Sequence, residues 1–149
     1  MKACFAFLFV ASLAATPVVA APANCPNIGL ARQPVTFSTA KGRFTYTLDL
    51  AATPAQQECG LMFRKSMRRD VGMAFAFAPP RPLTFWMENT PLPLDLIFVG
   101  ADGRVVSVGA GVPFARDLID SHGVAARVIE LNAGQARRMG LKPGDRVTP

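Results

Sequence analysis

Strict alternation of apolar and polar residues at 44–50 constrains the fold of this chain more than any other feature of its sequence. The apolar residues occupy every second position, namely Phe44, Tyr46, Leu48 and Leu50. This spacing places them on one face of a β-strand. A similar run at 35–39 comes before it, across the turn sequence at 40–42. We therefore expect a β-hairpin with one buried face.

Short apolar runs separated by turn residues continue to the end of the chain. They predict further strands at 72–78, 83–87, 94–99, 105–108, 125–131 and 146–148. Pro79 and Pro80 are expected to end the strand at 72–78, because proline has no N–H to donate to a sheet. The residues at 109–123 are expected to form an irregular loop.

Two short helices are expected among these strands. Thr53 is a favourable N-cap for a helix at 54–59 that ends at Gly60. Asn132 is expected to cap a second helix at 133–139. Because no strand–helix–strand unit is predicted, we expect an α+β domain. Its core would be a mostly antiparallel, barrel-like sheet of seven or eight short strands.

The first twenty residues are typical of a signal peptide. Lys2 supplies a positive start, an apolar run of only twelve residues follows at 4–15, and small residues at 18–20 suit a cleavage site. The expected organisation is a signal peptide at 1–20, an extended tail at 21–34 and a single domain at 35–149. The expected location is the periplasm or the medium, with an uncleaved anchor as the alternative. No other apolar run approaches the ~20 residues of a transmembrane helix, so the cleaved chain is not expected to be an integral membrane protein.

Two cysteines follow the predicted cleavage site. In an oxidising compartment, Cys25 and Cys59 favour a disulfide that ties the tail to the first helix. Two free thiols or a pair of metal ligands are the alternatives. Because neither cysteine belongs to a Cys-x-x-Cys motif, thiol redox catalysis is not expected.

The chain is basic, with a formal net charge of +6. Arginine and lysine concentrate at 64–69, which is interpreted as a solvated loop or as an anion site. Nucleic acid is not an expected partner, because no nucleic-acid motif or aromatic ladder accompanies the charge. A monomer that binds a small molecule or an envelope protein is expected.

Several sequence blocks resemble the family called domain of unknown function 192. The blocks are Gly-Leu-Met-Phe-Arg at 60–64, Gly-Met at 72–73, Phe-Trp-Met-Glu-Asn-Thr at 85–90, Pro-Leu-Asp at 93–95, Asp-Gly-Arg-Val at 102–105, Val-Ile-Glu-Leu at 128–131, Ala-Gly at 133–134, Gly140 and Gly-Asp at 144–145. The resemblance covers residues 43–148. It implies a small β-rich domain, often exported, and it supplies no established activity.

The segment 85–95 is the candidate binding region. The hypothesis is a ligand patch with an aromatic face and polar groups, made of Arg64, Trp86, Asn89, Thr90 and Asp95. In the structural alternative, Asn89 and Thr90 bond the turn backbone, Asp95 locks it, and Trp86 anchors the core. Arg64 would then pair with Asp95 or with Glu88 inside the fold. Side chains alternate along a strand, so Trp86 and Met87 should face opposite sides.

The leading interpretation is a binding domain without catalysis and without a cofactor. One alternative is a hydrolase that uses Asp95 or Glu88 as acid or base. Another is periplasmic copper handling through three thioethers, those of Met62, Met73 and Met87. The run 120–122 (Asp-Ser-His) contains the residue types of a catalytic triad, but triad members converge from separate segments, so a surface-loop His122 is favoured. No zinc ligand set is recognisable.

Overall fold

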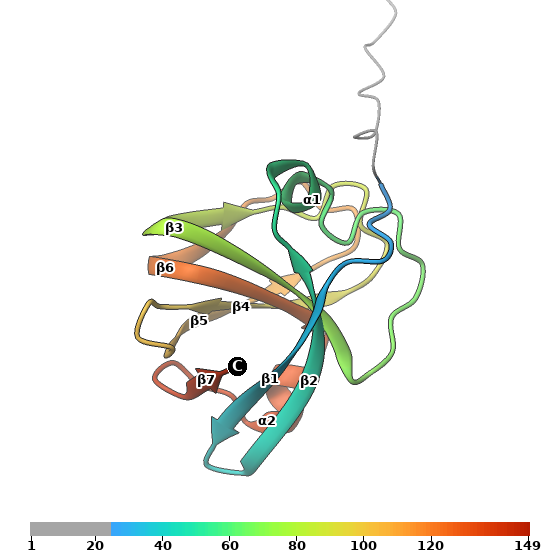
Figure 1. Cartoon of the computed structure of the whole chain (residues 1–149). Coiled ribbons are helices and arrows are strands. Elements are labelled where there is room, and N and C mark those ends of the chain that lie inside the picture. The colour runs from blue at the N-terminus through green and yellow to red at the C-terminus, as the bar shows by residue number, and fades with distance from the viewer. Residues whose placement is uncertain (1–24) are drawn as a thin grey trace, which may run out of the picture.

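The computed structural model describes residues 25–149, and the predicted signal peptide lies outside them. The chain folds as one curled, seven-stranded sheet with two short helices (Figure 1). The elements are β1 (Arg32–Thr39), β2 (Gly42–Ala51), α1 (Pro54–Cys59), β3 (Val71–Phe85), β4 (Leu94–Val99), β5 (Val105–Gly111), β6 (Ile119–Asn132), α2 (Gln135–Met139) and β7 (Arg146–Thr148). Within the described residues, no helix is long and apolar enough to span a membrane.

The predicted hairpin forms as β1 and β2. They pair antiparallel, with Val35 opposite Tyr46 and Phe37 opposite Phe44. Phe37 and Tyr46 are almost fully buried and meet edge to face, with 5.6 Å between ring centroids. The alternating pattern therefore specifies the buried face, as expected.

The strands follow the order β5-β4-β6-β3-β2-β1-β7. An isolated bridge between Arg104 and Arg146 joins the start of β5 to β7, so the two ends of the order approach each other. This curling gives a half-barrel, which agrees with the predicted barrel-like sheet. The predicted antiparallel arrangement holds only in part, because the sheet is mixed. β2 and β3 run parallel, and α1 is the connection between them. The expectation that the chain has no strand–helix–strand unit was therefore wrong.

The sheet buries apolar side chains on both faces. On β4, Leu96 and Phe98 belong to one core cluster, whereas Ile97 and Val99 belong to the other. The first cluster includes Leu61, just after α1, with Phe75 and Leu83 of β3. The second cluster includes Met139 of α2. β4 is thus covered on both faces, as its nearly all-apolar sequence indicates.

The largest departure from the predictions is the course of β3. The sequence predicts two strands separated by prolines, but one strand runs from Val71 to Phe85 and folds back on itself. The rings of Phe75 and Phe85 lie only 5.4 Å apart, whereas ten residues of straight strand span roughly 33 Å. The pairing with β6 is interrupted between Ala76 and Arg81. The prolines at 79–80 lie in this interruption, where their lack of an N–H removes no hydrogen bond between strands.

Two further boundaries were predicted wrongly. β6 begins at Ile119, because it follows the bent β3 as its partner, and so the irregular loop is shorter than 109–123. α2 begins at Gln135 behind Gly134, and Asn132 remains in β6. The Asn132 side-chain amide donates to the carbonyls of Met67 and Arg68, so it is not available as a helix cap.

Candidate functional site

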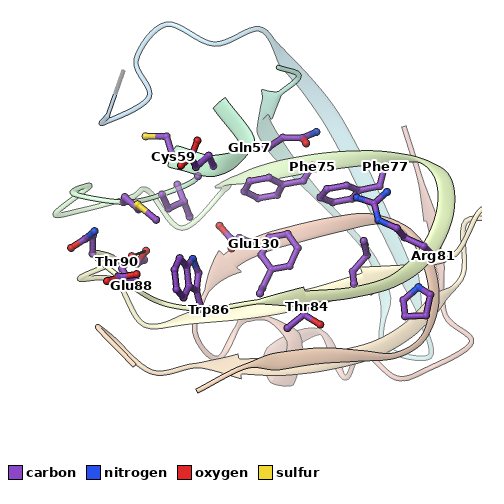
Figure 2. A pocket seen from close by; sticks show the side chains of 18 residues that line it. Gln57, Cys59, Phe75, Phe77, Arg81, Thr84, Trp86, Glu88, Thr90 and Glu130 are labelled. Carbon is purple, nitrogen blue, oxygen red and sulfur yellow. Dashed lines mark hydrogen bonds between the residues drawn. The ribbon is translucent and has the colours of Figure 1, made fainter. Parts of the chain in front are cut away.

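A cavity of about 610 Å³ lies between the two limbs of the bent β3. We call the limbs the first limb (71–76) and the second limb (81–85), and the space between them the limb cavity. The end of α1 and the loop that follows β3 complete its lining, together with β6. Figure 2 shows Phe75 and Phe77 on one side, Thr84 and Trp86 on the other, and Glu130 between them.

Aromatic side chains form much of the cavity wall. Phe85 meets both Phe75 and Phe77 edge to face, at 5.4 and 6.1 Å between ring centroids. The Arg81 guanidinium, at the bend, covers the Phe77 ring at 5.0 Å. Trp86 is 49% exposed and marks the mouth of the cavity. Aromatic rings therefore line the cavity both near solvent, at Trp86, and near the core, at Phe75.

Glu130 lies at the bottom of the limb cavity and is 5% exposed. No described residue donates a hydrogen bond to its carboxyl or forms an ion pair with it. Since no fully buried side-chain oxygen of the described residues lacks a partner, the carboxyl oxygens must open onto the cavity. Its cross-strand neighbours are Met73 on β3 and Leu96 on β4, both fully buried. Burial among such residues raises the pKa of Glu130 to about 8.

Three loops meet beside the mouth of the cavity, and each contains a residue with positive φ. These residues are Phe63, Asn89 and Phe114, with φ of 61°, 55° and 60°. The Phe63 N–H donates to the Asn89 carbonyl at 2.8 Å, and the Phe114 N–H donates to the Thr90 carbonyl at 3.1 Å. Left-handed phenylalanine is rare and costs backbone strain. The contacts between these loops hold that conformation in place.

Three of the five residues in the predicted ligand patch come together here. Trp86, Asn89 and Thr90 line the limb cavity with Glu88. The Thr90 hydroxyl also donates to the Glu88 carbonyl at 3.2 Å, so it supports the turn as well. The Glu88 carboxylate accepts from Arg116 at 2.9 Å. Trp86 is half-exposed and is therefore not a core anchor.

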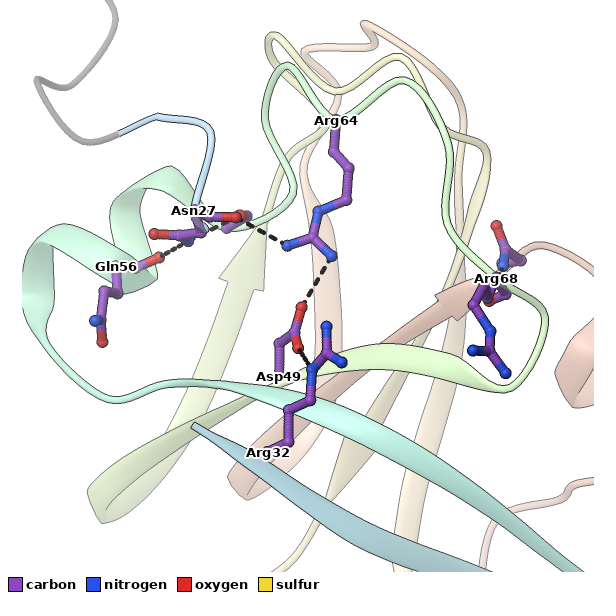
Figure 3. Close-up of polar contacts among 8 residues, drawn as sticks. Asn27, Arg32, Asp49, Gln56, Arg64 and Arg68 are labelled. Carbon is purple, nitrogen blue, oxygen red and sulfur yellow. Dashed lines mark hydrogen bonds and ion pairs between the residues drawn. The ribbon is translucent and has the colours of Figure 1, made fainter. Parts of the chain in front are cut away.

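Arg64 and Asp95, the other two residues, lie outside the limb cavity. Arg64 pairs with Asp49 at 2.9 Å, and Arg32 pairs with the other oxygen of the same carboxylate at 2.8 Å (Figure 3). The internal pair predicted for Arg64 thus forms, but with neither Asp95 nor Glu88. Asp95 accepts from the Ala136 N–H at 2.7 Å and so fixes the start of α2.

The residues behind the alternative hypotheses are also placed. Met73 and Met87 are buried in the same core cluster, and Met62 lines the limb cavity. The predicted strand at 83–87 ends earlier, at Phe85, so strand alternation does not apply to Trp86 and Met87; Met87 is nevertheless buried, at 1% exposed, whereas Trp86 is half-exposed. In residues 25–149, no three His, Cys, Asp or Glu side chains gather as a metal site requires.

The triad hypothesis for 120–122 has no geometric support. The Ser121 hydroxyl accepts from the Leu83 N–H at 2.9 Å and donates to the Gly123 carbonyl at 2.6 Å. The Asp120 carboxylate accepts from the Thr84 hydroxyl at 2.7 Å. His122 is exposed, and it lies at the start of β6 rather than in the predicted loop. Ser121 is thus occupied in holding the second limb to β6.

The predicted disulfide between Cys25 and Cys59 is present. Cys59 lines the limb cavity at the end of α1. Next to it, the Asn27 amide donates to the carbonyls of Gln56 and Gly60, each at 2.9 Å. The segment before β1 therefore fixes the end of α1 that borders the cavity.

Sequence reasoning did not identify Glu130 as a site residue. The available signal was a single acidic residue inside the apolar run Val128–Leu131, on a strand expected to be buried. A charge at such a position is rarely tolerated without a partner or a function. The pattern could have indicated the residue, but not the cavity it faces, because the cavity depends on the bend of β3.

Comparisons with known proteins agree with this fold. The crystal structure of a protein of unknown function from Novosphingobium aromaticivorans DSM 12444 is 42% identical, with a TM-score of 0.79 over 91% of this chain and 100% of that chain. A Sinorhizobium meliloti 1021 protein, described as a candidate transcription regulator, is also 42% identical, with a TM-score of 0.78 over 82% of this chain and 96% of that chain. Curated protein sequences give no match. The model of the domain of unknown function 192 (DUF192, "Uncharacterized ACR") matches residues 36–149. The chain belongs to the DUF192 family.

Proposed function

We propose that this protein is an exported domain that binds a small organic molecule in the limb cavity. The observation that carries the proposal is the Glu130 carboxyl, which opens onto the cavity without a partner from the described residues. Leaving a buried polar group unpaired costs about 1–3 kcal/mol, and more when it is charged. A ligand that supplies the missing partner would recover that free energy, whereas an ordinary core position would simply be apolar.

The size and lining of the limb cavity support the same proposal. Its volume of about 610 Å³ falls within the roughly 300–1,000 Å³ of small-molecule sites. Such sites combine apolar and aromatic walls with a few polar groups. Here Phe75, Phe85 and Trp86 supply the walls, and Glu130 and Asn89 supply polar groups. A ligand of one or two rings would fit this space.

Binding without catalysis is favoured over the hydrolase alternative. Of the two carboxylates considered for that alternative, Asp95 lies outside the limb cavity and accepts from the Ala136 N–H. Glu88 does line the cavity, and it is paired with Arg116. Export is supported by the signal-like sequence at 1–20 and by the disulfide, which persists in oxidising compartments. Fractionation of the producing cell, with mass spectrometry of the mature N-terminus, tests the location.

Trp86 allows a direct test of binding, because it is the only tryptophan in the chain. The oxidised protein is screened by NMR against several hundred small aromatic and heteroaromatic compounds, with the Trp86 indole N–H as reporter. Binding compounds should shift this resonance together with the amides of Phe75 and Phe85. Shifts that gather outside the cavity, or a screen without any shift at these three residues, would contradict the proposed site.

A further inference from the structure

We infer that the limb cavity takes a ligand with a protonated amine, whose ammonium group pairs with the carboxylate of Glu130 while its apolar body packs against the aromatic wall. This inference rests on the proposed function and specifies its ligand class. The lining of the cavity is acidic on balance. Three carboxyl side chains line it, those of Glu58, Glu88 and Glu130, against one cation, Arg81.

The single cation is already engaged, which leaves Glu130 for the ligand. Arg81 covers the Phe77 ring at the bend of β3, with its Cζ atom 5.0 Å from the ring centroid. Glu88 has its own partner in Arg116, at 2.9 Å. Glu58 is exposed on α1. The carboxyl at the bottom of the cavity is thus the buried acidic group for which the described residues provide neither a donor nor a counter-charge.

The aromatic wall suits a cation as well as an apolar body. The faces of phenylalanine and tryptophan rings carry negative partial charge and attract ammonium groups within about 6 Å. Phe75 and Phe85 line the limb cavity together with Glu130, and Trp86 stands at its mouth. An ammonium group is a donor on all its N–H bonds, whereas an ionised carboxylate only accepts. The ammonium group can therefore donate hydrogen bonds to the carboxylate, and at this buried position little water competes for them.

Binding of this kind is coupled to loss of a proton. Burial raises the pKa of Glu130 to about 8, so the empty cavity holds a neutral carboxylic acid at pH 7. Pairing with R–NH₃⁺ requires the carboxylate, and the Glu130 proton is released to solvent as the complex forms. The other ionisable groups that line the cavity are Glu58, Arg81 and Glu88, while β3 and β4 oppose Glu130 with Met73 and Leu96.

The test uses three probes of nearly equal size and different charge. They are 2-phenylethylamine, 2-phenylethanol and phenylacetate, titrated into the oxidised protein by calorimetry and by fluorescence of Trp86. At pH 8 the amine should bind at least tenfold more tightly than the alcohol, and phenylacetate should bind more weakly still. From pH 6 to pH 8 the ionised fraction of a group with a pKa of about 8 rises about 50-fold, and the association constant of the amine should rise equally.

Two variants separate Glu130 from the general charge of the protein. Glu130→Gln should abolish both the preference for the amine and its pH dependence, whereas Asp117→Asn, which removes an exposed charge outside the lining of the cavity, should preserve both. Calorimetry of the wild type in two buffers of different ionisation enthalpy should show proton release at pH 7. Because this last measurement uses the wild type, it tests the inference even if the Glu130 variant folds poorly.

The outcomes distinguish this inference from the proposed function. Equal binding of alcohol and amine, or an amine preference that survives Glu130→Gln, overturns the inference while binding in the limb cavity stands. Failure of all three probes at millimolar concentration also overturns it. In that case the broader NMR screen with Trp86 as reporter decides whether the cavity binds small molecules at all.

Discussion

Replacing Glu130 with glutamine should remove a large pH dependence from the stability of this protein. The folded state holds the Glu130 carboxyl at a pKa of about 8, against an ordinary value of 4.5. Because the folded-state pKa is the higher one, folding favours the protonated form. The stabilisation from this proton is complete below pH 4.5 and is lost as the pH rises through 8.

The magnitude follows from the two pKa values. The difference between 4.5 and about 8, at roughly 1.4 kcal/mol per pH unit, gives about 5 kcal/mol once Glu130 is ionised. Near pH 7 the wild type should already have lost about 3 kcal/mol relative to pH 4.5. An ordinary domain has a total stability of about 5–15 kcal/mol, so ionisation of this one carboxyl would remove a large fraction of it.

The assay is urea unfolding followed by Trp86 fluorescence at pH 5, 6, 7 and 8. The comparison is between pH profiles, because glutamine leaves a buried amide with its own cost at every pH. The free energy of unfolding of the wild type should fall steeply relative to that of Glu130→Gln. Glu58→Gln, which changes an exposed carboxyl of the same cavity, should keep the wild-type profile.

Parallel pH profiles of the wild type and Glu130→Gln would refute this reasoning. They would mean that the carboxyl ionises in the folded state as readily as in the unfolded chain. The limb cavity would then be far more solvated than its lining indicates, and Glu130 would have water in place of the missing partner.

Further predictions concern the surrounding fold. Replacing Cys59 with serine opens a disulfide across 34 residues and should lower stability by about 3–4 kcal/mol in the chain-entropy model, measured by urea unfolding. Asp49→Asn weakens two arginine pairs at a carboxylate that is 5% exposed and should cost about 3 kcal/mol, whereas Asp70→Asn, at an exposed pair, should leave the unfolding midpoint unchanged. In Gly72→Ala the new methyl would lie 2.5 Å from the backbone oxygen of Glu130, so a marked drop in melting temperature is expected.

The local parts of the fold could be predicted because their signals are local. Alternation at 44–50 specified the hairpin of β1 and β2. Thr53 and Gly60 delimited α1, and Thr53 forms a capping box with Gln56. The sequence of β4, apolar except for Asp95, indicated burial on both faces. In each case the residues that determine the element lie within it or next to it.

The limb cavity could not be predicted because it depends on contacts distant in the sequence. The proline pair at 79–80 correctly signals an interruption, but it does not say whether the chain leaves the sheet or folds back along it. The outcome depends on pairing with β6, more than thirty residues later, and on packing of Phe85 against Phe75. The polar and aromatic character of Trp86, Asn89 and Thr90 therefore pointed to three residues that line the cavity, but it did not point to Glu130.

A crystal structure of the oxidised protein with 2-phenylethylamine at pH 8.5 tests the central claim most directly. We expect the amine in the limb cavity, with its nitrogen about 2.8 Å from a carboxylate oxygen of Glu130 and its ring against Phe75, Phe85 or Trp86. An empty limb cavity at saturating amine, or an amine whose nitrogen points to solvent with its ring at Glu130, would contradict the claim.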